Sequence, residues 1–226
     1  MDIHIQVWQA LVIALWVALV QSRILFGTAT LTLRFSPMMT GLFTGIVLGN
    51  VPAAMMTTAA IQLIYMGVFA PGGAMPSEPC VATAIAVPVA ILGGLEPTEA
   101  VAIAVPVGLL GSYLYQGRFF LNTFIVKLTD KNAANLNDGA LFRSIIIYPF
   151  FAAALLYIPF MFIALYFGAP VIASFVQANS SGRFFHALST IGGGLASIGI
   201  ALTVYVIGKK NYIVFFTIDE SAKVVD

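Results

Sequence analysis

Long apolar stretches separated by short polar breaks dominate the chain. A helix that crosses a bilayer needs about 20 mostly apolar residues, because each residue adds about 1.5 Å and the hydrocarbon layer is about 30 Å thick. Residues 3–20, 144–167 and 184–208 satisfy this requirement. We predict a spanning helix in each, and we expect the first to be retained because the N-terminus has neither a basic leader nor a small-residue cleavage site ahead of the first polar break.

Residues 37–116 are also apolar, but prolines and glycine pairs interrupt them repeatedly. The breaks fall at Pro52, Pro71, Pro76, Pro79, Pro88, Pro97 and Pro106 and at the glycine pairs 72–73 and 93–94. Broken backbone at membrane depth is tolerated where protein or a watery cavity satisfies its polar groups, and transporters place such breaks at their substrate sites. This segment is therefore where we expect the function to lie. Ordinary tilted helices with proline kinks remain the alternative.

Composition excludes several classes of protein. Hydrophobic residues make up 60% of the chain, charged residues 8%, and the mean hydropathy is +1.00. A water-soluble domain of this size needs more charge at its surface, so the solvent is a lipid bilayer. The net charge of +1 and the lack of a basic run argue against nucleic-acid binding. A single cysteine, Cys80, allows no intrachain disulfide.

The polar segments predict the connections between the membrane helices. Residues 21–36 carry Arg23 and Arg34, with polar and apolar positions alternating over residues 28–33, and we interpret the segment as an interfacial connector. Residues 119–127 are typical of a short amphipathic helix that leads into the polar loop 128–143. That loop carries Lys131 and Arg143, so we expect it on the cytoplasmic side.

Glycines recur at every fourth position in the first half of the chain. Gly41, Gly45 and Gly49 fall on one face of a helix, and Ala53 continues the series. Small side chains on one face allow another backbone to approach closely. The spacing predicts tight helix packing and carries no chemistry.

Three polar residues are candidate substrate ligands. Glu78 stands between prolines in Pro76-Ser77-Glu78-Pro79, where its carboxylate is available to the hydroxyl groups of a polar ligand; a solvated glutamate that caps the next helix is the alternative. Gln62 offers a donor and an acceptor, although an interhelical hydrogen bond explains it almost as well. Asn50 is the third candidate, and a structural role as the C-terminal cap of a helix is the alternative.

The other polar residues are predicted to have structural roles and to take no part in catalysis. Glu96 and Glu99 flank Pro97, which is the usual composition of a helix start. His4 and His186 have no Cys or carboxylate at ligand spacing, so we expect neither a metal nor a cofactor. The chain shows no nucleophile with a base beside it. We therefore predict a protein that binds and moves a molecule, and no enzyme.

Three motifs together resemble a known family. GLFTGIVLGN at residues 41–50, AIQL at 60–63 and APGGAMPSEP at 70–79 are similar to the IIC component of the mannose/fructose/sorbose/N-acetylgalactosamine phosphotransferase systems. The similarity covers residues 3 to about 216 and is most specific over residues 37–80, where the broken helices lie. The Pro-Gly-Gly and Pro-x-Glu-Pro patterns resemble the amino-sugar members more than the mannose permeases.

The resemblance implies an all-α, multi-pass protein of the bacterial inner membrane, with a sugar-carrying core of re-entrant hairpins that moves against a scaffold in an elevator-like manner. It implies a IID membrane subunit as partner, oligomers of IIC–IID units, and phosphorylation of the sugar by IIB, which IIA charges. Residues 1–216 would form the IIC domain and residues 217–226 a polar tail. Gln62, Glu78 and Asn50 would bind a hexose or an N-acetylhexosamine.

Departures from the family keep two other functions open. Mannose-type members often carry an acid where this chain has Gln62, and many members have Asp where it has Asn50. Members also usually continue with a hydrophobic segment after the position of Lys209 and Lys210, where this chain instead has its polar residues 217–226. A membrane scaffold that does not transport is the first alternative, and an ion-gradient-driven carrier is the second.

Overall fold

The computed structural model describes residues 4–22, 33–34, 36–65, 77–135, 138–178, 186–187, 190–194, 197–198 and 201. Within these residues every regular element is a helix. The helices are α1 (Val7–Ser22), α3 (Pro37–Leu48), α4 (Val51–Tyr65), α5 (Pro79–Gly93), α6 (Pro97–Ala134), α7 (Asp138–Phe142), η2 (Arg143–Ile147), α8 (Tyr148–Ile163), η3 (Ala164–Gly168) and α9 (Ala169–Ala178). The predicted span 184–208 and the predicted tail 217–226 lie largely or wholly outside the described residues.

Two continuous helices dominate the molecule. One is α6, and the other runs from Asp138 to Ala178 through α7, η2, α8, η3 and α9; both are long and apolar enough to cross a membrane. The second contains the predicted span 144–167 and confirms a helix there. At about 1.5 Å per residue α6 is about 57 Å long, well beyond the thickness of the hydrocarbon layer.

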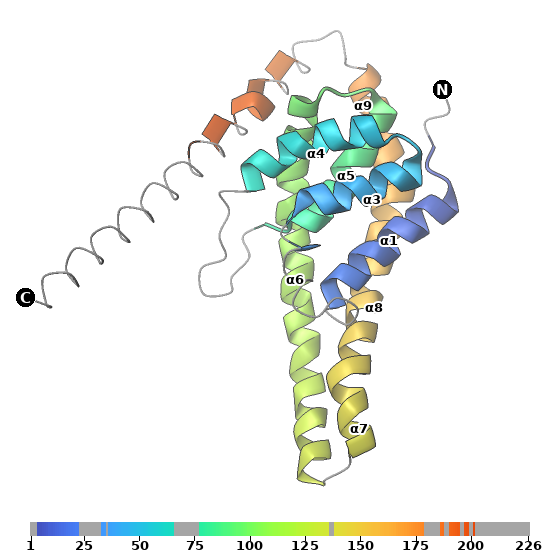
Figure 1. Cartoon of the computed structure of the whole chain (residues 1–226), viewed down its shortest axis with the longest axis vertical. Helices are drawn as coiled ribbons and strands as arrows, with labels where there is room; N and C mark the ends of the chain where they lie inside the picture. Colours follow the sequence, from blue (N-terminus) through green and yellow to red (C-terminus); the bar gives the residue numbers. More distant parts are fainter. Residues whose placement is uncertain are drawn as a thin grey trace, which may run out of the picture.

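The short helices occupy the segment where the sequence predicted broken spans. The helices α3, α4 and α5 have 12, 15 and 15 residues, fewer than a full span requires. Figure 1 shows α3 and α4 side by side, lying across the direction of α6. The helix α1 has 16 residues and corresponds to the first predicted span, at residues 3–20. It begins at Val7 and ends at Ser22.

The predicted glycine face is where α3 packs on α4. A Cβ atom added to Gly45 would lie 2.6 Å from the Cβ of Ala54, and one added to Gly41 would collide with Thr58. Gly49 ends α3 in the left-handed conformation at φ 73°, which glycine adopts without strain. The close packing predicted from the spacing is confirmed.

Two predictions about the second half of the chain are wrong. Pro106 was one of the predicted breaks, yet α6 continues through it, which agrees with the alternative of helices that contain internal prolines. Residues 119–127 were expected to form a separate short helix before a polar loop at 128–143, but they belong to α6, and helix also covers 128–134 and 138–143. The polar residues therefore mark the tip of a helical hairpin that extends beyond the rest of the molecule.

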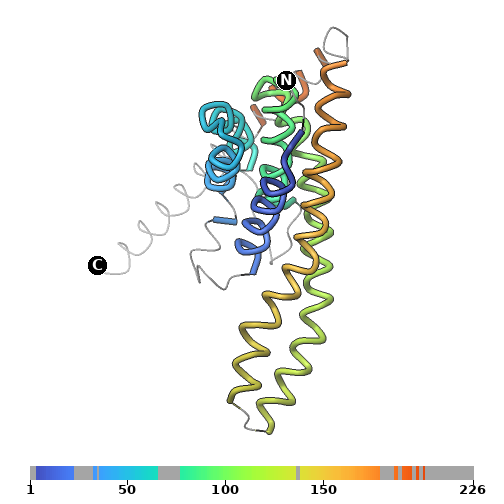
Figure 2. The backbone as a smooth tube through the Cα atoms, turned by 90° about the vertical axis from the view of Figure 1, so that its right-hand side faces the viewer, coloured from blue at the N-terminus to red at the C-terminus, as the bar shows by residue number. Residues whose placement is uncertain are grey.

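The molecule divides into a body and an arm. The arm comprises residues 119–134 and 138–152; the body comprises α1, α3, α4, α5 and residues 97–118 and 153–178. Figures 1 and 2 show the arm projecting as two antiparallel helices away from the body. All nine buried residues of α6 lie in its body half, between Glu99 and Arg118.

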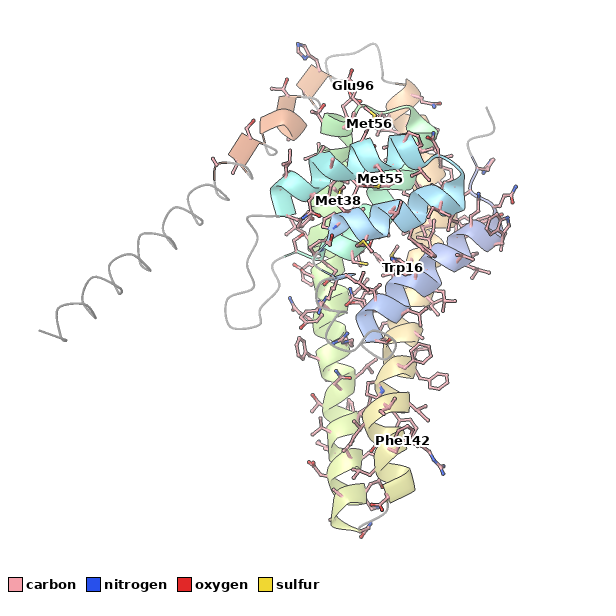
Figure 3. The ribbon with its side chains drawn as sticks, in the orientation of Figure 1. Trp16, Met38, Met55, Met56, Glu96 and Phe142 are labelled. Atoms are coloured by element: carbon pink, nitrogen blue, oxygen red, sulfur yellow. The ribbon has the colours of Figure 1, made fainter. Side chains whose placement is uncertain are left out.

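Small residues build the centre of the body. Residues 79–90 of α5 are all buried, because the neighbouring helices surround this helix. The helix α1 packs along α8, and its residues Ala10, Ala14 and Ala18 are completely buried. On the other side of α1, Trp16 stacks on Phe43 of α3 with ring centroids 4.3 Å apart. Figure 3 labels Trp16. This packing fixes the helix ends that carry the polar residues.

Candidate functional site

Polar side chains from four separate segments meet inside the body. We call them the polar cluster: Gln21 at the end of α1, Arg34 just before α3, Glu78 at the start of α5, and Tyr115 and Arg118 in the middle of α6. Each has less than a tenth of its surface exposed. Charged groups buried in an apolar interior are costly unless they are paired, so their mutual contacts decide what the cluster can do.

Glu78 forms the centre of the polar cluster. Its Oε2 accepts a hydrogen bond from Arg34 Nη2 at 2.6 Å, and its Oε1 accepts hydrogen bonds from Arg34 Nε at 3.1 Å and Gln21 Nε2 at 2.6 Å. Both oxygens are thus held in a two-point, charge-assisted pair with Arg34. Glu78 occupies the N-cap position of α5, but its side chain makes no cap hydrogen bond and is completely buried. The alternative of a solvated capping glutamate is therefore wrong.

Arg34 lies deep in the molecule and not at an interface. Its guanidinium stands over the ring of Tyr115, 4.0 Å from the centroid, and only 2% of the residue is exposed. Arg118 is 5.5 Å from the same centroid and donates a hydrogen bond to the backbone carbonyl of Gln21. The connector predicted at 21–36 is corrected at both ends, because Gln21 belongs to α1 and Arg34 is buried.

Glycines in α6 allow the start of α5 to approach. The backbone N–H of Glu78 donates to the carbonyl of Gly108 at 2.9 Å. A Cβ atom added to Gly111 would lie 2.9 Å from the Cβ of Glu78, and one added to Gly108 would collide with the hydroxyls of Tyr65 and Ser77. Those two hydroxyls are hydrogen-bonded to each other at 2.9 Å. The end of α4, the start of α5 and the middle of α6 therefore meet at one point.

Gln62 lies near the end of α4 that approaches the polar cluster. Its Oε1 accepts a hydrogen bond from the backbone N–H of Met38 at 3.3 Å, in the first turn of α3, where Figure 3 labels Met38. Met38 follows Arg34 by four residues, and Thr40, in the same helix as Met38, contacts the sulfur of Cys80 at 3.4 Å. The structure thus brings Gln62 and Glu78 to the same end of the short helices. Gln62 is half-buried.

Asn50 lies at the opposite end of the α3–α4 pair. It is exposed, and its Oδ1 accepts a hydrogen bond from the backbone N–H of Ala53 at 3.3 Å. It therefore caps the start of α4, whereas the end of α3 is capped by Gly49. Asn50 and Gln62 are about 18 Å apart along α4, at about 1.5 Å per residue. The structure does not bring Asn50 together with the other two candidates.

Sequence reasoning missed four members of the polar cluster as site residues. Gln21 and Arg34 were assigned to a connector, and Tyr115 and Arg118 received no role at the site. The available signal was the rule that an ionisable residue inside an apolar segment marks function by default. Arg34 and Arg118 both satisfy that rule once the surrounding segments are recognised as helices.

The two carboxylates at the start of α6 are structural, as predicted. Glu99 Oε2 accepts a hydrogen bond from the backbone N–H of Glu96 at 2.9 Å, and the Glu96 side chain accepts one from the N–H of Glu99. This reciprocal capping box is a standard helix start. Among the described residues, no three or more His, Cys, Asp or Glu residues are grouped to hold a metal.

A cavity of about 500 Å³ lies elsewhere in the body, between α5, α6, α8, η3 and α9. Apolar side chains line it, including Ile85, Val107 and Phe160. A sugar needs hydrogen-bonding partners, and this cavity offers almost none. The polar cluster and Gln62 remain the better candidate site.

Comparisons with known proteins agree with this architecture. The family model of the sorbose-specific IIC component of the phosphotransferase system matches residues 7–219. No curated protein sequence matches significantly. A structure described as a membrane protein superimposes with a TM-score of 0.70 at 19% identity, over 96% of this chain and 87% of that chain.

A second solved structure is the mannose transporter ManYZ in complex with microcin E492. It superimposes with a TM-score of 0.62 at 19% identity, over 99% of this chain and 88% of that chain. At this identity the two structures establish the fold alone. They confirm the predicted all-α polytopic membrane architecture.

Proposed function

The chain belongs to the sorbose-specific IIC family of the phosphotransferase system, a family of permease subunits, and we propose that it binds a hexose or an N-acetylhexosamine and translocates it for phosphorylation. The IIB protein, charged by IIA, performs the phosphoryl transfer in this proposal. The amino-sugar pattern at residues 70–79 favours N-acetylgalactosamine among the substrates. The cell location is the bacterial inner membrane.

One observation carries the proposal: several helix ends converge on a buried polar cluster inside an apolar body. Short, interrupted helices whose ends meet are the arrangement that transporters use to present backbone and side-chain polar groups to a substrate. Here α3, α4 and α5 are all shorter than a membrane span, and Glu78, Arg34 and Gln62 lie where their ends meet. A scaffold that does not transport has no need for a charge pair at this depth.

The three predicted ligands take different roles in this proposal. Gln62 is half-buried and contacts the sugar through its amide. Glu78 orders the site through Arg34 and contacts the sugar in a conformation that opens the polar cluster. Asn50 lies about 18 Å from Gln62 along α4, so it meets the sugar at a different stage of translocation. The body carries the sugar, and the arm belongs to the scaffold.

The arm is the surface proposed for the IID partner. Its phenylalanines at 119, 120, 124, 142 and 151 are all more than half exposed. The solved mannose transporter that this chain resembles is named ManYZ. A related membrane subunit packing on the arm would cover these rings, and repetition of that contact would give an oligomer of IIC–IID units.

The experiment follows sugar phosphate in cells that contain this chain with its IID and IIAB partners. A panel of labelled hexoses and N-acetylhexosamines is offered with and without phosphoenolpyruvate. We expect phosphorylated product that depends on phosphoenolpyruvate, largest for an N-acetylhexosamine. Free sugar accumulating under an ion gradient would establish a carrier instead, and a well-inserted complex that takes up no sugar would establish the scaffold.

A further inference from the structure

Two completely buried polar atoms beside the ion pair have no hydrogen-bond partner among the residues that the structure describes. They are the hydroxyl of Tyr157 in α8 and Oε1 of Gln21 in α1, and both residues are 0% exposed. Buried polar atoms are nearly always hydrogen-bonded, because water has been removed and nothing has replaced it. Two such atoms in one region point to a missing partner.

The identity of the orphan atom on Gln21 is fixed by its neighbour. The Gln21 amide faces Glu78 Oε1 at 2.6 Å, and an ionised carboxylate only accepts hydrogen bonds. Turning the amide over would place two oxygens against each other. The nitrogen therefore faces Glu78, and the atom left over is an acceptor.

The two atoms belong to one neighbourhood. The helices α1 and α8 pack along each other, and the charged groups of Glu78, Arg34 and Arg118 act electrostatically on the Tyr157 hydroxyl. Gln21 is bonded directly to Glu78 and to Arg118 through its backbone. Gln21 is thus a member of the polar cluster, and Tyr157 lies within electrostatic range of the charged members of the cluster.

A hydroxyl that needs an acceptor and an amide oxygen that needs a donor are complementary to a single water molecule. Buried waters commonly bridge such groups, with about three hydrogen bonds each. Both atoms are inaccessible from outside, so the sugar itself does not reach them in this conformation. We propose that Tyr157 Oη and Gln21 Oε1 hold one ordered water, which links α8 to the Glu78–Arg34 pair through Gln21.

The test measures thermal unfolding of the purified full chain for wild type and Tyr157→Phe. If a water is bound, the variant takes away one of its partners and the midpoint falls by about 2 to 4 °C. If no water is present, removing an unsatisfied buried hydroxyl leaves the midpoint unchanged or raises it. Tyr148→Phe is the matched control, because Tyr148 lies in the same helix and is 39% exposed; it should not shift the midpoint.

A double-mutant cycle separates a shared water from two independent effects. Gln21→Met is combined with Tyr157→Phe, and the two shifts are expected to be non-additive if both residues hold the same molecule. Should Gln21→Met fail to fold, a density map that resolves waters decides the matter. A peak within hydrogen-bonding distance of both atoms is expected, and additive shifts or a dry interface would overturn the proposal.

Discussion

The two halves of α6 share one helix but have opposite surroundings. From Pro97 to Arg118 the helix is enclosed by α4, α5 and α8, and glycines at 108 and 111 admit neighbouring side chains. From Phe119 onward no residue of α6 is buried, and its rings point outward. The arm as a whole buries one described residue, Ser144. The same helix is therefore a packed core element in the body and an exposed surface in the arm.

The comparison shows where substitution should matter. In the body, charges are paired and small residues touch neighbours, so a change leaves a partner unsatisfied or creates a collision. In the arm, side chains face outward and a change alters only the surface. Stability and sugar handling should depend on the body, while assembly should depend on the arm.

The largest expected effect comes from breaking the buried ion pair. Arg34→Ala leaves the Glu78 carboxylate buried without its counter-charge, at a cost of about 3 to 5 kcal/mol. We expect little folded protein, measured by thermal unfolding and by the amount recovered from membranes. Arg143→Ala, which removes an exposed arginine of the arm, is the control and should change stability by less than about 0.5 kcal/mol. An equal loss of stability in the two variants would refute the distinction between the packed body and the exposed arm.

Two glycines of α6 offer the cleanest test of packing. Gly108→Ala places a Cβ against Tyr65 and Ser77 and should destabilise the fold by about 1 to 3 kcal/mol. Gly117→Ala meets only Leu156 at 3.9 Å, so it should stabilise the helix by about 0.5 to 1 kcal/mol. Thermal unfolding of both variants in the same detergent measures the difference. Shifts of the same sign would show that α6 is not packed as described.

Much of the body was predictable from sequence because its signals are local. Interrupted apolar segments predicted the short helices α3, α4 and α5, glycine spacing predicted their packing, and Glu96 with Glu99 predicted a helix start. Each of these signals acts within a few residues, through backbone conformation or the absence of a side chain.

The arm and the polar cluster were not predictable in the same way. Pro106 removes one backbone hydrogen bond, which a well-packed membrane helix tolerates, so it predicted a break that does not occur. The polar residues 128–143 were expected to form a loop because composition does not distinguish a loop from a helix that emerges into water. Arg34 and Glu78 are 44 positions apart, and a pairing over that separation has no local sequence signal.

The smallest effect is expected at Asn50. Asn50→Ala removes the cap at the start of α4 and should cost about 1 kcal/mol. Asn50→Ser keeps an acceptor at the cap and serves as the control. In uptake assays both variants should remain closer to wild type than variants at Gln62, since Asn50 lies at the far end of the helix pair. A loss of uptake in Asn50→Ala as large as that at Gln62 would move the main sugar contact to that end.

The measurement that tests the central claim most directly is the affinity of the purified IIC–IID complex for its sugar, by titration calorimetry. Gln62→Leu in the body should weaken binding about tenfold or more, because one lost hydrogen bond costs about 1 to 3 kcal/mol. Gln62→Glu keeps the acceptor for Met38 and should retain the fold, and Phe124→Ala in the arm should leave affinity unchanged. Wild-type affinity in Gln62→Leu, together with weakened binding in a still-assembled Phe124→Ala complex, would contradict the account.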